Sequence, residues 1–135
     1  MKAGVSQYDA QGEYYFAEGC FITELSNSVQ DPGVSIARAR VEPGKTTRWH
    51  RLRDTAERYV ILQGSGLVEV DSLAAREVGV GDVVIIPPAA RQRIRNNGAD
   101  DLTIDSNGSF VFDKILSDGS TYEVTIHKQP ELQEC

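Results

Sequence analysis

Short runs of alternating hydrophobic and polar residues recur along the chain, and these runs predict β-strands. No long segment repeats apolar residues at the i, i+3, i+4, i+7 spacing of an amphipathic helix. Turn residues separate the runs, and short strands at this spacing favour an all-β sandwich or barrel. The expected strands are Phe21–Leu25, Val34–Val41, Thr46–His50, Tyr59–Gln63, Leu67–Val70, Val83–Ile86, Gln92–Arg95, Leu102–Ile104, Phe110–Asp113 and Tyr122–His127. The expected turns include Asp31-Pro32-Gly33, Gly64-Ser65-Gly66 and Asn107-Gly108.

Two of these runs predict more than a strand. The segment Val34–Val41 alternates strictly, with Val34, Ile36, Arg38 and Arg40 on one face and Ala37, Ala39 and Val41 on the other. Small side chains turned inward would suit a ligand cavity, but alternation alone does not decide which face points inward. The segment Val83–Ile86 is apolar on both faces, which predicts a strand covered on both sides by a second sheet or a partner subunit.

Composition narrows the classes of function. The chain has 135 residues, enough for one domain with a real core, and its formal net charge of −6 disfavours nucleic acid as a partner. No apolar run approaches ~18 residues, so we expect no membrane span. The polar N-terminus shows no secretory signal and the two cysteines form no disulfide framework, so we expect a cytoplasmic protein. Cys20 is expected as a buried strand residue, with a reactive thiol as the alternative.

Arginine is the one basic residue type that clusters. The cluster consists of Arg48, Arg51, Arg53, Arg58, Arg91, Arg93 and Arg95. One interpretation is that these side chains point outward and keep the protein soluble. The other is that some of them line a pocket and bind an anionic small molecule, because the planar guanidinium donates two hydrogen bonds to a carboxylate or phosphate.

Two spaced motifs follow one another in the middle of the chain. The first is Gly44-x5-His50-x-Leu52-x4-Glu57-x6-Gly64, and the second is Gly81-x5-Pro87-x-Ala89-x2-Gln92-x3-Asn96. Sixteen residues, Ser65 to Val80, separate them. This frame resembles the two motifs of the cupin family, and in particular small single-domain cupins of the conserved-barrel type.

The resemblance implies an architecture. The fold would be an all-β double-stranded β-helix, or jelly-roll, barrel forming one domain over residues 1–135. Its barrel core would cover about residues 20–105, after an N-terminal arm at residues 1–19. Residues 106–135 would add a C-terminal β-hairpin, because their strand pattern restarts around Asn107-Gly108. The family also implies a homodimer.

The resemblance further implies a site inside the barrel. The usual cupin site holds a divalent metal with three histidines and one glutamate. His50 and Glu57 match two of these positions, whereas Leu52 and Gln92 stand where the second and third histidines would be. His50, Glu57 and Gln92 could hold Mn, Fe, Ni or Zn as a three-residue set. Alternatively no metal binds, and His50 and Glu57 hydrogen-bond each other or a ligand, or His50 is a packed polar core residue.

Three classes of function remain open at this point, because cupin folds host many chemistries. The first is a metal-dependent lyase, isomerase or oxygenase acting on a small polar or anionic metabolite, with His50 and Glu57 as catalytic acid and base. The second is a non-catalytic module that binds a sugar or small acid without metal. The third is a structural dimerisation domain. The expected ligand-binding residues are Gln92, Arg48, Arg58 and Tyr59.

Overall fold

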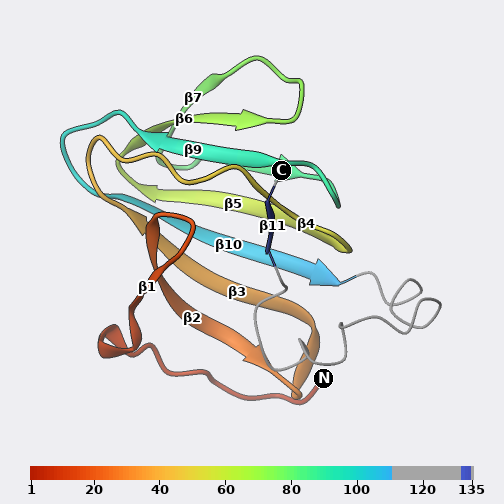
Figure 1. The fold of residues 1–135 in the computed structure, drawn as a ribbon. Coiled ribbons are helices and arrows are strands. Elements are labelled where there is room, and N and C mark those ends of the chain that lie inside the picture. The colour runs from red at the N-terminus through yellow and green to blue at the C-terminus, as the bar shows by residue number, and fades with distance from the viewer. Residues whose placement is uncertain (111–131, 135) are drawn as a thin grey trace.

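The chain folds into antiparallel β-structure, as a computed structural model that describes residues 1–110 and 132–134 (Figure 1). The elements are the 3-10 helix η1 (Ala10–Gly12) and the strands β1 (Tyr14–Phe16), β2 (Cys20–Ser28), β3 (Asp31–Val41), β4 (His50–Leu52), β5 (Thr55–Gln63), β6 (Ser65–Val70), β7 (Arg76–Gly79), β8 (Val83–Ile86), β9 (Gln92–Asn96), β10 (Leu102–Phe110) and β11 (Leu132–Glu134). Within the described part of the chain, no helix has the length and apolar character needed to cross a membrane. The all-β class predicted from the alternation is confirmed.

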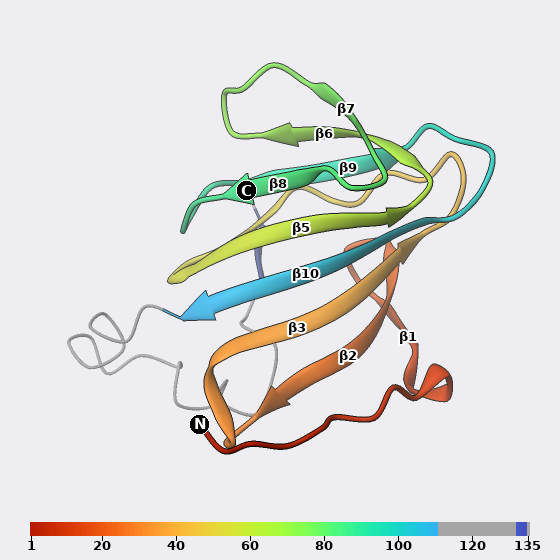
Figure 2. The same ribbon diagram turned by 180° about the vertical axis from the view of Figure 1, so that it is seen from behind.

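Two sheets make up the fold. One has the strand order β1-β2-β3-β10-β5-β8 and the other the order β11-β4-β9-β6-β7. The two views of the ribbon show the sheets as two stacked layers that the chain crosses repeatedly (Figures 1 and 2). This crossing brings the two sequence motifs together, because β4 and β9 are neighbours in one sheet while β5 faces them from the other.

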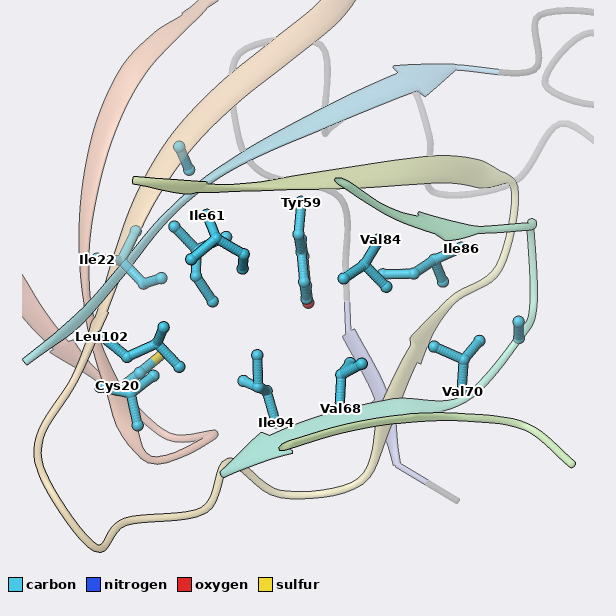
Figure 3. Packing of buried hydrophobic residues seen from close by; sticks show 14 residues of the cluster. Cys20, Ile22, Tyr59, Ile61, Val68, Val70, Val84, Ile86, Ile94 and Leu102 are labelled. Atoms are coloured by element: carbon cyan, nitrogen blue, oxygen red, sulfur yellow. The ribbon is translucent and has the colours of Figure 1, made fainter. Parts of the chain in front are cut away.

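The hydrophobic core fills the space between the sheets (Figure 3). Ile61, Leu102 and Ile104 enter it from the six-stranded sheet, and Val68 and Ile94 meet them from the five-stranded sheet. Each of these side chains is at most 6% exposed. Burying one aliphatic side chain of this size contributes roughly 1.5–3 kcal/mol to the stability of the fold. Burial of this layer is therefore the main interaction that holds the two sheets together.

The alternation of β3 is resolved in favour of small residues inside. Ala37, Ala39 and Val41 point between the sheets. Arg38 and Arg40 point outward, where Arg38 pairs with Asp105 at 2.8 Å and Arg40 pairs with Glu13 at 2.8 Å. The inner face of this strand therefore carries methyl-sized groups where longer side chains would fill the interior.

Strand β8 departs from its prediction. Val84 and Ile86 are buried in the core, but Val83 is 54% exposed and Ile85 is 69% exposed. The expectation that this segment is covered on both faces is therefore wrong for the single chain. Strand β8 lies at the edge of its sheet, where only its inner face meets other strands of the same chain.

The turn predicted at Asn107-Gly108 is absent. Strand β10 runs without interruption through both residues and pairs with β3 on one side and β5 on the other. Gly108 is buried, and a Cβ atom there would lie 3.1 Å from Thr55 Cγ2. Glycine at this position therefore serves close packing between strands rather than a reversal of the chain. Residues 106–110 belong to the six-stranded sheet, and Leu132–Glu134 form β11 beside β4 in the other sheet. Residues 111–131 of the predicted C-terminal hairpin, which include its strand Tyr122–His127, lie outside the described residues.

Two other predicted boundaries are wrong. The turn expected at Asp31-Pro32-Gly33 lies at residues 29–30, and Asp31 already pairs with Ser28 at the start of β3. The strand expected over Thr46–His50 begins only at His50. Its predicted first part crosses from one sheet to the other, with the backbone N–H of Thr47 donating to Ile94 and that of Arg48 donating to Glu18. Those residues make single bonds to different partners, so no regular ladder forms.

Candidate functional site

A cavity of about 70 Å³ lies between the two sheets. A water molecule needs roughly 10–15 Å³ of such space, so the cavity has room for several waters or a small organic molecule. Its lining combines apolar and polar side chains. The lining residues are Tyr14, Phe16, Glu18, Cys20, Ile22, Ala37, Ala39, Val41, Thr47, His50, Leu52, Glu57, Tyr59, Ile94, Ile104 and Ser106. The alanines of β3 account for part of the open space, because their side chains end at Cβ.

His50 enters the cavity from β4 and is 4% exposed. Its Nδ1 lies 2.7 Å from the backbone oxygen of Arg48, and since a carbonyl only accepts, Nδ1 carries the proton and donates. Its Nε2 lies 3.3 Å from Glu18 Oε2. That approach is favourable when a proton is held by one of the two groups, either as an imidazolium beside a carboxylate or as a carboxylic acid beside a neutral ring.

Glu57 enters the cavity from β5, and both of its carboxyl oxygens accept hydrogen bonds. Gln92 Nε2 donates to Oε1 at 2.6 Å, and Ser106 Oγ donates to Oε2 at 2.8 Å. Burial raises the pKa of Glu57 to about 7, against the opposing effects of the Ser106 hydrogen bond and the nearby His50. This carboxyl group therefore changes its protonation near neutral pH, as a general acid or base requires.

Gln92 stands behind Glu57 rather than on the cavity wall. It is fully buried in β9, directly opposite His50 in the pairing of β4 with β9. Its amide nitrogen orients the Glu57 carboxyl group, while its Oε1 has no hydrogen-bond partner among the described residues. The structure thus brings together the three residues expected at the centre, with Gln92 as the positioning residue.

The sequence reasoning missed the acidic cavity residue Glu18. Glu18 lies in the turn between β1 and β2, within the segment predicted as an N-terminal arm, and precedes Gly19, whose φ of 96° lets the chain reverse there. The Cys20 thiol donates to Glu18 Oε1 at 3.2 Å. Burial raises the pKa of Cys20 far above its usual range, so this sulfur is a buried donor and not a thiolate. An acidic residue beside a turn glycine just before an apolar strand was the only available signal for Glu18.

Tyr59 and the two expected arginines separate in the structure. Tyr59 is buried on the cavity wall, and burial raises the pKa of its hydroxyl well above the usual value. Arg48 and Arg58 are exposed and do not line the cavity, so the expectation that they line the ligand pocket is wrong. Arg58 alternates with Glu57 and Tyr59 along β5, and its side chain therefore points to the opposite face of the sheet.

Other members of the arginine cluster also lie on the outside. The guanidinium groups of Arg91 and Arg93 lie over the ring of Trp49, at 4.1 and 4.5 Å from its centroid. Arg93 also pairs with Glu69 at 2.8 Å. Their role in the fold is to cover the outer face of the five-stranded sheet through cation–π and ionic contacts.

The donor atoms do not fit the metal site that the motifs imply. Leu52 lines the cavity but cannot ligate. Gln92 turns its amide nitrogen, which cannot ligate, toward Glu57. Across residues 1–110 and 132–134, no three His, Cys, Asp or Glu side chains are grouped so that they could hold a metal ion. A first-row metal prefers several imidazole or carboxylate ligands, and this set supplies too few.

Two facing antiparallel sheets around an internal polar site are typical of the double-stranded β-helix fold. Comparison with known proteins identifies the family. The Cupin domain model matches residues 37–106, and the chain belongs to the cupin family. An uncharacterized protein of Methanocaldococcus jannaschii is 36% identical over 100 residues, which cover 73% of this chain and 79% of that protein.

Solved structures share this fold at low sequence identity. A Cupin 2 conserved barrel domain protein of Salinispora arenicola superposes with a TM-score of 0.70 at 17% identity, covering 86% of this chain and 98% of that one. A predicted oxalate decarboxylase of Thermotoga maritima superposes with a TM-score of 0.62 at 21% identity, covering 68% and 81%. Likenesses at this level of identity establish the fold alone.

Proposed function

We propose that this cupin binds a small polar molecule in the cavity between its sheets, through Glu57, His50 and Glu18 and without a metal ion. The observation that carries the proposal is the convergence of these three ionisable side chains on one wall of an internal space. Burying ionisable groups is costly unless they are paired. Clusters of buried ionisable groups are concentrated at functional sites. The apolar residues of the lining would hold the carbon skeleton of the ligand.

The test fills the cavity without touching its polar groups. Ala39→Leu adds three carbon atoms to a lining residue, so fragments that bind in the cavity should lose at least about ten-fold in affinity. Ligand-detected NMR with a library of small polar fragments measures this, in the presence of EDTA so that any binding seen is independent of free metal. Ala56→Leu, which makes the same change on the outer face of β5, is the matched control.

The proposal fails if no fragment bound by the wild-type protein is lost in Ala39→Leu. It also fails if binding is abolished by EDTA and restored by adding a divalent metal, because the ligand would then require the ion.

An acid–base enzyme, a lyase or an isomerase, is the second candidate. The pKa of Glu57 near 7 favours it, because this carboxyl group could both accept and return a proton at neutral pH. For a fragment that binds, the wild-type protein should speed exchange of a ligand C–H proton with D₂O, followed by NMR. Glu57→Gln should remove this exchange while leaving the fold intact. Exchange at equal rates with both proteins would leave binding as the function.

A further inference from the structure

The ionisable side chains on the cavity wall are mostly acidic. Of the described residues that line it, Glu18 and Glu57 are carboxylic acids, His50 is a histidine, and none is lysine or arginine. An anionic ligand would place its charge beside these carboxyl groups, where little water screens it, and like charges there cost several times more than in bulk solvent.

The cavity also carries an acceptor that lacks a donor. Glu18 Oε2 is buried and has no hydrogen-bond partner among the described residues, although His50 Nε2 lies 3.3 Å away. Buried acceptors are nearly always satisfied in folded proteins. A ligand with N–H groups would satisfy this one, whereas a carboxylate, which only accepts, would not.

His50 does not offset this preference. Its Nδ1 proton is committed to the backbone oxygen of Arg48, and its Nε2 faces Glu18. Both ring nitrogens therefore already face an acceptor, so the ring has no N–H group left to donate to an anionic ligand. Arg48 and Arg58, which could have received an anion, lie outside the cavity.

From these contacts we propose that the cavity selects a small nitrogen cation of the amidine or amine class over a carboxylate, with the carboxyl groups of Glu18 and Glu57 accepting its N–H donors. The inference rests on the proposed function, since it names the class of ligand for the same site. A flat amidinium presents N–H groups on both of its nitrogens, and their charge-assisted hydrogen bonds to carboxylates are stronger than those between neutral groups.

Three probes of nearly equal shape and different charge test this selectivity. They are acetamidinium, acetamide and acetate, each titrated into the wild-type protein at neutral pH and followed by protein NMR. We expect acetamidinium to bind most tightly, acetamide less tightly, and acetate at least about ten-fold more weakly than acetamidinium. Acetate binding as tightly as acetamidinium overturns the inference, and so does the absence of binding by all three probes.

A variant shows whether Glu18 acts on ligand charge. Glu18→Gln keeps the size of the side chain and removes its charge, so acetamidinium should lose about ten-fold in affinity while acetamide changes by less than about three-fold. Equal loss for both probes would mean that Glu18 only supports the fold of the site, which contradicts the inference. Glu24→Gln, an exposed position on β2 outside the cavity, is the matched control and should change neither.

Failure here is distinguishable from failure of the proposed function. If fragments bind and are lost in Ala39→Leu, but the charge order of the three probes is reversed, the cavity is a ligand site of the opposite selectivity. If no fragment responds to Ala39→Leu, the cavity is not a ligand site at all.

Discussion

At position 57 a carboxyl group is held inside the barrel between an amide donor and a hydroxyl donor. Both hydrogen bonds favour the ionised form, and so does the nearby His50. Burial outweighs them, because the charged form loses its hydration, and the pKa rises from 4.5 to about 7. Between these two pH values the folded protein therefore holds a proton at Glu57 that the unfolded chain has released.

This difference predicts a pH dependence of stability. The pKa of Glu57 is higher in the folded state than in the unfolded chain. The contribution of Glu57 to the free energy of unfolding should therefore be largest below about pH 4.5 and should be lost as the pH rises through 7. A shift of this size corresponds to about 3 kcal/mol at most. Denaturant unfolding at pH 5 to 8 measures it, with Glu57→Gln expected to flatten the profile.

The exposed Glu24→Gln variant supplies the comparison for that profile and should keep the wild-type slope. A Glu57→Gln protein that loses stability with pH as steeply as the wild type would show that other groups cause the dependence.

At the scale of elements, the sequence predicted strands well where one face is buried. Strand β8 has the bounds expected from its apolar run, and the alternation of β3 marked the small residues that line the cavity. Local patterns failed where long-range packing decides. Asn107-Gly108 has the composition of a turn, but Gly108 is needed where β10 passes close to Thr55. The residues next to Gly108 in the sequence do not contain that information, because Thr55 is far from it along the chain.

The candidate site shows the same division. The cupin motif frame brought His50, Glu57 and Gln92 to one place, because their spacing reflects strands that the barrel closes on each other. Glu18 belongs to no motif and lies in a turn that follows the short strand β1. Its approach to His50 depends on how the N-terminal strands lie against β4, which the residues around Glu18 do not specify. Arg48 and Arg58 do not line the cavity because their side chains point outward, and the spacing of a motif does not predict the direction of a neighbouring side chain.

For the whole molecule, two of the edge strands border one groove. Strand β8 ends the six-stranded sheet and β7 ends the five-stranded sheet. A groove of about 410 Å³ lies between them, with Arg76, Glu77 and Asp82 beside apolar side chains. The exposed large apolar residues that line this groove are Leu73, Val83 and Ile85. Exposed apolar groups gathered beside unpaired strand edges mark an interaction surface.

We expect a second copy of this chain to cover the exposed face of β8. A two-fold interface places the same patch on both sides, and a patch that carries apolar groups with charges of both signs is complementary to itself. Val83→Thr combined with Ile85→Thr keeps β-branched residues in the strand while removing apolar surface, so sedimentation velocity should show a dimer for the wild type and a monomer for the variant. Val5→Thr with Val29→Thr changes two exposed valines away from this edge and should leave the dimer intact. A wild-type protein that sediments as a monomer would show that no stable dimer forms. A variant that remains dimeric would show that the interface does not include the exposed face of β8, because the variant differs from the wild type only at positions 83 and 85.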